Sequence, residues 1–101
     1  MGTRSRSSAG GAQFGLSVAG TVATLTVPRT AMCAEIYVRT SSPPIVFTRD
    51  GTDPTSTQGI QANGGDLILL NSRDELERFK AIRQTSTSAT VDCEYFTDLS
   101  G

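Results

Sequence analysis

The chain has 101 residues, a length that gives a single domain a hydrophobic core of its own. Nine Lys and Arg residues against ten Asp and Glu residues give a net charge of −1, which argues against a dedicated nucleic-acid-binding protein with a strongly basic face. Histidine is absent, so the chain lacks the usual general base near neutral pH and the commonest metal ligand.

No stretch of the sequence approaches the roughly 18 consecutive apolar residues that a membrane-spanning helix requires. The arginines near the N-terminus are not followed by an apolar run, so this end does not resemble a secretory signal. We therefore expect a protein that folds in the cytoplasm and has no membrane partner.

Residues 1–12 are predicted to form a flexible N-terminal arm, because they are rich in Gly and Ser and have almost no apolar side chains to bury. Arg4 and Arg6 give this arm a charge of +2. The arm is either a frayed terminus or a segment that becomes ordered on a neighbouring subunit. In the second case, Arg4 and Arg6 are the candidate partner-binding residues. The remainder, residues 13–101, is predicted to be one domain.

The first half of this domain contains short segments typical of β-strands. In the segment 33–39, alternation places Ala34, Ile36 and Val38 on one face; the other, more polar face carries Cys33, Glu35, Tyr37 and Arg39. Strands are predicted at 14–18, 21–27, 33–39 and 45–48.

The strand at 45–48 leads into Asp50-Gly51, a dipeptide typical of tight turns because Gly51 can adopt a positive φ. Pro54 cannot donate a hydrogen bond to a neighbouring strand, so it is expected at a sheet edge or outside the sheet. Asp50, Gly51 and Pro54 are therefore predicted to set the fold by joining two strands.

The second half begins with a predicted turn at 63–65 and an apolar run, 66–70, that could be buried on both faces. Residues 71–77 are predicted to form one helical turn, with Ser72 as the N-cap and Glu75 completing a capping box. Strands are predicted at 79–83 and 89–96, the latter with Val91, Cys93 and Tyr95 facing inward.

About seven short strands with regularly spaced turns, and no long helix, indicate an all-β protein with an antiparallel β-sandwich.

Cys33 and Cys93 are far apart in the sequence and form no CxxC pair, so a structural zinc site is not expected. A disulfide between an early and a late strand is conceivable, but the predicted polar-face position of Cys33 argues against it. Reduced, buried thiols in a protein of the cytoplasm are the favoured interpretation.

The sequence offers little catalytic chemistry. Asp50 and Asp53 could belong to a calcium loop, but the ligand spacing of an EF-hand is missing and turn formation explains both residues. The acidic residues of 74–77 have basic neighbours that account for them by pairing on a short helix. Without a histidine partner for Ser or Cys nucleophiles, we expect no enzyme activity and no cofactor.

Residues 45–55 resemble a strand and turn of the immunoglobulin-like accessory domains of chitobiases and hexosaminidases. Those domains have an aromatic residue, Thr, any residue, Asp-Gly, then Thr or Ser, and Pro-Thr, and Phe47–Thr55 follows most of this pattern. A longer pattern, continuing through Gly65–Leu69, Phe79–Arg83 and the last strand, is similar to small virion proteins of tailed bacteriophages. The resemblance covers roughly residues 33–96 and implies an immunoglobulin-like sandwich. The arm matches neither group.

The phage resemblance implies a non-enzymatic structural protein: a decoration or cement protein on the capsid exterior of the virion. Its expected partners are the major capsid protein and neighbouring copies of itself in a homo-oligomer, with no nucleic acid. Repetition on a symmetric shell would make weak contacts collectively strong.

Three alternatives are compatible with the same sequence. One is another virion location, such as a head–tail, tail or fibre-attachment component. Another is a carbohydrate-associated accessory module, although Trp is absent and only two Tyr and four Phe are available to stack on sugars. The third is a small host-directed or regulatory protein.

Overall fold

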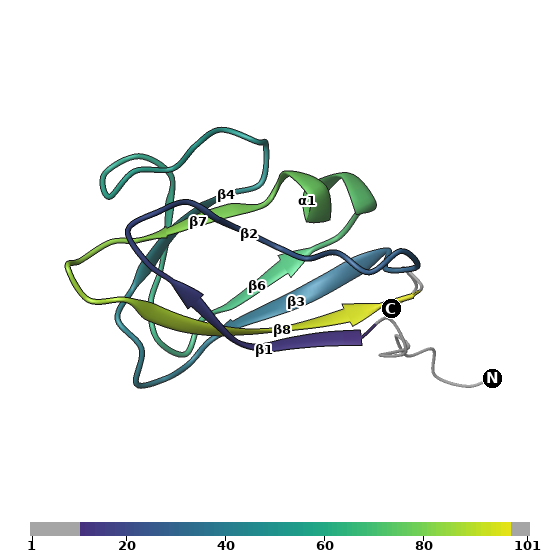
Figure 1. Ribbon diagram of the computed structural model, residues 1–101, viewed down its shortest axis with the longest axis horizontal. Helices are drawn as coiled ribbons and strands as arrows, with labels where there is room; N and C mark the ends of the chain where they lie inside the picture. The colour runs from purple at the N-terminus through teal and green to yellow at the C-terminus, as the bar shows by residue number, and fades with distance from the viewer. Residues whose placement is uncertain (1–10, 98–101) are drawn as a thin grey trace.

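The computed structural model describes residues 11–97, which form eight strands and one short helix (Figure 1). The predicted arm ended at residue 12, whereas the first strand already begins at Gly11 because its backbone pairs with the last strand. The elements are β1 (Gly11–Val18), β2 (Ala23–Thr24), β3 (Cys33–Val38), β4 (Ile45–Thr48), β5 (Ile60–Ala62), β6 (Leu67–Leu70), α1 (Arg73–Arg78), β7 (Lys80–Arg83) and β8 (Ala89–Phe96).

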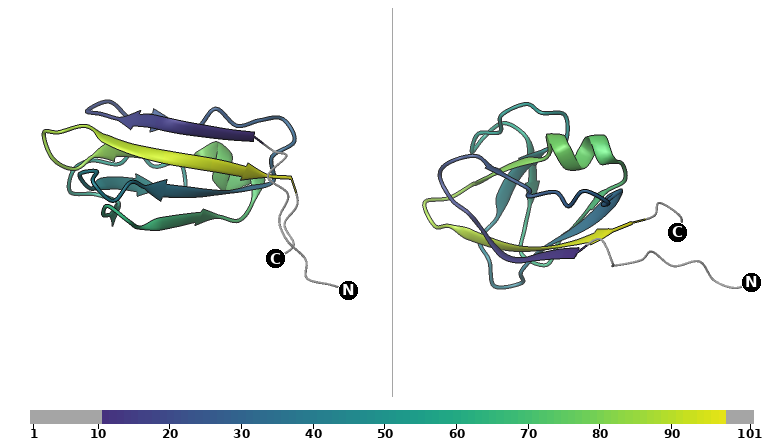
Figure 2. Two further views of the ribbon diagram at one scale, coloured as in Figure 1. Left: turned by 90° about the horizontal axis from the view of Figure 1, so that it is seen from below. Right: turned by 45° about the vertical axis from the view of Figure 1, so that its right-hand side comes forward.

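The strands form two four-stranded antiparallel sheets, which confirms the all-β prediction. Sheet A has the order β1-β8-β3-β6, and sheet B has the order β2-β7-β4-β5 (Figures 1 and 2). The strand pairing is nested along the sequence. The innermost pair is β4–β5, and it is enclosed in turn by β3–β6, β2–β7 and β1–β8. This is the strand order of an eight-stranded jelly roll.

The immunoglobulin-like strand order implied by the resemblance is not the observed one. In that fold the first strand lies beside the second, in a sheet with the order ABED. Here β1 pairs with β8 and lies in a different sheet from β2. The turn motif is a local feature, and it does not determine how the other strands are ordered.

The core lies between the sheets and contains the side chains predicted to face inward from β3 and β8. Ile36 is directly opposite Cys93, and both are fully buried. Tyr95 is also buried, and its hydroxyl donates a 3.0 Å hydrogen bond to Oε1 of Gln13. Cys33 pairs with Phe96 and so points to the opposite face of sheet A from Cys93, which excludes a disulfide between them. Both cysteines are buried.

Helix α1 begins as predicted, with Ser72 as its N-cap. The Ser72 hydroxyl accepts a hydrogen bond from the Glu75 backbone N–H. The Glu75 carboxylate accepts one from the backbone N–H of Asn71, one residue earlier than in a standard capping box. Leu76 is the buried residue that anchors this short helix to the core.

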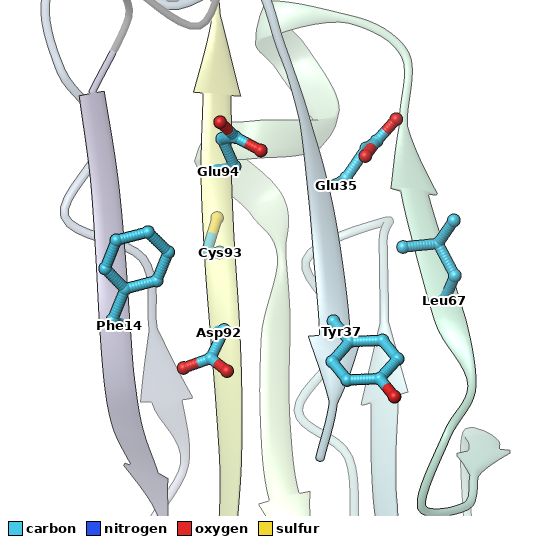
Figure 3. Close-up of a pocket in the computed structure, with 7 residues that line it drawn as sticks. All are labelled: Phe14, Glu35, Tyr37, Leu67, Asp92, Cys93 and Glu94. Carbon is cyan, nitrogen blue, oxygen red and sulfur yellow. The ribbon is translucent and has the colours of Figure 1, made fainter. Parts of the chain in front are cut away.

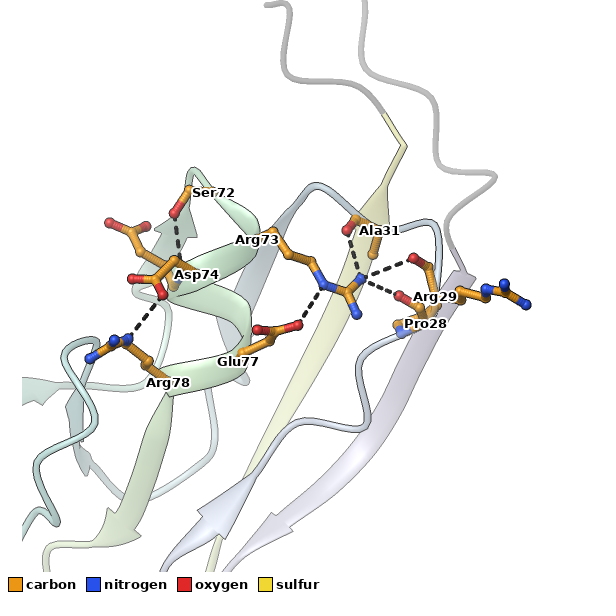
Figure 4. Close-up of polar contacts among 9 residues, drawn as sticks. Pro28, Arg29, Ala31, Ser72, Arg73, Asp74, Glu77 and Arg78 are labelled. Carbon is orange, nitrogen blue, oxygen red and sulfur yellow. Dashed lines mark hydrogen bonds and ion pairs between the residues drawn. The ribbon is translucent and has the colours of Figure 1, made fainter.

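Arg73 ties α1 to the chain that enters β3. One guanidinium nitrogen donates hydrogen bonds to the backbone carbonyls of Pro28, at 2.6 Å, and Ala31, at 2.9 Å, and more weakly to that of Arg29 (Figure 4). Its Nε pairs with Glu77 at 2.9 Å. These bonds hold a connection that contains little regular structure, since the strand predicted at 21–27 is reduced to the two residues of β2.

The two apolar runs of four residues behave differently. Every residue of β4 is buried, whereas β6 alternates between exposed and buried positions, so the prediction that 66–70 is buried on both faces is wrong. The outward-facing Val46 of β4 is covered by the connection 49–59. A Cβ added to Gly59 would lie only 2.5 Å from Cγ1 of Val46, which shows how closely this connection approaches the strand.

The predicted Asp-Gly turn lies in this same connection rather than in a tight hairpin. Oδ1 of Asp50 accepts a 2.9 Å hydrogen bond from the Thr52 N–H, and Gly51 has a φ of +89°. Pro54 is buried and lies outside the named strands. A 2.6 Å ion pair between Asp53 and Lys80 links the connection to β7.

Candidate interaction surface on sheet A

The outer face of sheet A, which points away from the core, carries a group of exposed apolar side chains. Phe14 comes from β1, Tyr37 from β3 and Leu67 from β6, as Figure 3 shows. Leu69 continues the group along β6. The exposed fractions are 70% for Phe14, 54% for Leu67 and 39% for both Tyr37 and Leu69. Exposed apolar side chains gathered on one face mark a surface for interaction.

Strand register explains why these side chains gather. Tyr37 is directly opposite Leu67, and Glu35 is directly opposite Leu69. Residues opposite each other in antiparallel strands point to the same face. A shallow depression of about 200 Å³ lies among them; its lining residues are Phe14, Glu35, Tyr37, Leu67, Asp92, Cys93 and Glu94.

Carboxylates border this apolar group. Asp92 accepts two hydrogen bonds from Arg39, at 2.8 and 2.9 Å, and one from the Gly15 N–H at 2.8 Å. These bonds lower the pKa of the Asp92 carboxyl, with the Arg39 bond as the largest cause. Gly15 has a φ of +70° and lies at the irregularity between Gln13 and Leu16 in the β1–β8 pairing, where it aims its N–H at Asp92.

Glu35 and Glu94 lie directly opposite each other on neighbouring strands of this face. The outer face therefore combines an apolar row with a pair of carboxylates.

The buried Cys93 thiol and Tyr95 hydroxyl are not activated as nucleophiles. Burial raises the pKa of the Cys93 thiol to about 11 and also raises the pKa of the Tyr95 hydroxyl. Both groups therefore remain protonated near neutral pH, where a thiol is a poor nucleophile. Among residues 11–97, no group of three or more Cys, Asp or Glu side chains is arranged to hold a metal ion.

The fold-setting residues singled out from the sequence do not lie at this face. Arg4 and Arg6 lie outside the described residues. Asp50, Gly51 and Pro54 lie in the connection beside sheet B, where Asp50 makes its turn and Asp53 pairs with Lys80. Two of the three acidic residues of α1, Asp74 and Glu77, pair with arginines of the same helix, as predicted, whereas the Glu75 carboxylate accepts a hydrogen bond from the Asn71 N–H.

Sequence reasoning missed most of the outer face. The alternation of 33–39 did place Tyr37 on the outward side. Leu67 and Leu69 could not be found in this way, because a continuous apolar run does not show which of its sides is exposed.

Comparisons with protein-family models, curated proteins and solved structures gave no match to this chain. In the part of the chain that the structure describes, no helix has the length and apolarity needed to span a membrane.

Proposed function

We propose that the protein is a non-enzymatic structural component that binds other proteins through the outer face of sheet A. The observation that carries this proposal is the exposed group formed by Phe14, Tyr37, Leu67 and Leu69. A folded domain gains nothing from leaving these side chains in water. Burying apolar surface contributes about 25 cal/mol per Å², so a partner that covers them gains stability.

The biological setting we propose is the capsid exterior of a tailed bacteriophage, where the protein acts as a decoration or cement protein. The resemblance of residues 33–96 to small phage virion proteins supports this setting. The jelly-roll strand order adds support by analogy only, because this fold occurs in viral capsid domains but also in lectins and cupins. The proposed partners are the major capsid protein and neighbouring copies of the chain.

Binding through a small apolar face suits a symmetric shell. The face provides few anchors, so one isolated contact would be weak. Aromatic side chains such as Phe14 and Tyr37 often supply much of the binding energy at protein interfaces. On a shell, each copy has the same neighbours, and linked contacts raise the overall affinity without any new interaction. A head–tail or tail location would use the same face on a different partner.

A second candidate is a carbohydrate-associated module, and the depression on sheet A is the observation that favours it. Phe14 and Tyr37 are exposed near Asp92 and Glu94, which could accept hydrogen bonds from sugar hydroxyls. The exposed leucines of β6 favour a protein partner instead, since they offer no hydrogen bonds to a sugar.

The test is binding of the purified full-length chain to capsids that lack it. Replacing Tyr37 or Leu67 by Lys should weaken binding about tenfold or more, because each change places a charge in the apolar row. Ile60→Lys is the matched control, since Ile60 is 50% exposed but lies on β5 of sheet B. Failure of the unaltered protein to bind capsids would refute the decoration role, and binding to oligosaccharide arrays would favour the second candidate.

A further inference from the structure

Strand β6 forms one edge of sheet A. Among residues 11–97 it pairs with β3 alone, and Figure 3 shows Leu67 on this outermost strand. Natural proteins usually protect an unpaired edge with Lys, Pro or a bulge, because such an edge pairs readily with another chain. The sequence of β6, Leu-Ile-Leu-Leu, contains neither Lys nor Pro, and its register with β3 has no irregularity. The edge is therefore unprotected.

The hydrogen bonds between β3 and β6 show which backbone groups point outward. The Val38 N–H donates a 3.0 Å bond to the carbonyl of Asp66, the residue opposite it in the register. Hydrogen-bonded and non-hydrogen-bonded pairs alternate along an antiparallel ladder. Leu67 and Leu69 lie one and three residues beyond Asp66, so their N–H and C=O groups point away from β3. Within the described part of the chain, no hydrogen bond reaches these four groups.

The space on either side of β6 is open. Leu67 lines the depression on the outer face and also a second depression of about 230 Å³. The second depression lies between β6 and β5, where Ile60 and Gln61 contribute to its lining. Strand β5, the neighbouring edge of sheet B, therefore does not close over the edge of β6.

A second copy of β6 is complementary to this edge. When two copies run antiparallel with Ile68 opposite Ile68, Leu67 of each copy lies opposite Leu69 of the other. Each of these two pairs can exchange two backbone hydrogen bonds, which satisfies all the outward groups of both strands. Opposite side chains share a face, so the leucines pack together. Asp66 lies opposite Leu70 of the second copy, so the two carboxylates do not meet.

We propose that two copies of the chain associate through antiparallel pairing of their β6 strands, which joins their A sheets into one sheet of eight strands. The contact is two-fold symmetric and closed, so it ends at a dimer. The apolar rows of Phe14, Tyr37 and Leu67 become continuous across the dimer. This inference deepens the proposed function and rests on it in one respect, since it assigns a place to the neighbouring copies named there.

Sedimentation equilibrium of the full-length chain, without capsids, tests the association. The edge is only four residues long, so we expect dimers at about 100 μM protein and monomers at about 1 μM. Leu69→Pro removes an N–H that points away from β3, so the fold keeps its ladder, whereas the dimer loses two hydrogen bonds. This change should weaken dimerisation about tenfold or more. Tyr37→Lys is the matched control, since Tyr37 lies on the same face but one strand further in, and it should leave dimerisation unchanged.

Disulfide trapping tests the register without the proline variant. A mixture of Leu67→Cys and Leu69→Cys chains should form disulfide-linked dimers on mild oxidation, because opposite Cα atoms are about 5.5 Å apart. Either variant alone places its two new cysteines diagonally, about 7–8 Å apart, and should not cross-link. Cys33 and Cys93 are buried and should not react.

Three results would overturn the proposal. The first is a monomer at about 100 μM together with no cross-linking in the mixture. The second is cross-linking that is equally efficient in either variant alone. The third is a monomeric chain whose capsid binding is nevertheless weakened by Leu69→Pro, which would assign the edge to a strand of the capsid protein. Dimerisation is measured on the isolated protein, so failure of the decoration role would leave the first two results readable.

Discussion

The strands β4 and β6 are both apolar runs of four residues, yet only one of them is covered on both sides. The outward side of β4 lies beneath the connection 49–59, whose Gly59 packs against Val46. The outward side of β6 leaves Leu67 and Leu69 exposed. Among residues 11–97, the chain therefore covers the outward side of β4 in sheet B and leaves the outward side of β6 in sheet A exposed. This difference indicates that the face of sheet A is available for binding, whereas the corresponding part of sheet B serves stability.

The largest effect should come from comparing two neighbouring residues of β6. Leu70 is fully buried, and Leu70→Ala should lower the free energy of unfolding by about 2–5 kcal/mol. Leu69→Ala removes a side chain that is 39% exposed and should cost less than about 1 kcal/mol. Urea unfolding of both variants measures the difference. Equal losses would show that Leu69 is buried in the isolated protein.

Disturbing the connection that covers β4 should lower the free energy of unfolding almost as much as Leu70→Ala. Gly59 has a φ of +133°, and a Cβ at this position would collide with Val46. Gly59→Ala should therefore destabilise the protein by about 2–4 kcal/mol. Gly20→Ala is the control, because there the new Cβ meets only the flexible side chain of Arg83. A mild effect at Gly59, comparable to that at Gly20, would contradict the tight packing of this connection.

The polar contacts of α1 should contribute less to the free energy of unfolding than Leu70 or Gly59 does. Arg73→Ala removes the guanidinium donor from the carbonyls of Ala31 and Pro28, although the Pro28 carbonyl keeps its bond from the Ala31 N–H, and should lower the free energy of unfolding by about 1–3 kcal/mol. Arg78→Ala removes an exposed pair with Asp74 on the same helix, which should cost no more than about 0.5 kcal/mol. Thermal unfolding followed by circular dichroism would separate the two. A larger loss for Arg78 would show that Arg73 does not hold the entry to β3.

The smallest effect concerns Asp92 and depends on pH. Its pKa is lowered by the hydrogen bonds from Arg39 and Gly15, so its ionised form stabilises the folded state. This contribution is present above the ordinary Asp pKa and is lost as pH falls through the lowered value. The stability difference between the unaltered protein and Asp92→Asn should therefore shrink between about pH 5 and pH 2. Parallel stability curves over this range would argue against the Asp92 interaction.

Much of the local structure could be predicted because it depends on nearby residues. The alternation of 89–96 predicted β8 with its inward residues, and Ser72 with Glu75 predicted the start of α1. The strand order could not be predicted, since the pairing of β1 with β8 joins the two ends of the described chain. Whether Leu67 and Leu69 are exposed depends on whether a segment distant in the sequence packs over them, as the connection 49–59 packs over β4. The residues of the apolar run itself do not show this.

The outer face of sheet A is tested most directly as a binding surface by hydroxyl-radical labelling of Phe14, Tyr37 and Leu67 in the isolated protein and in capsids that carry it. Labelling of all three side chains should be clearly lower in the capsids, with Ile60 on sheet B labelled about equally in both states. Unchanged labelling of the three side chains, or protection confined to Ile60, would contradict the claim that the outer face of sheet A is the binding surface.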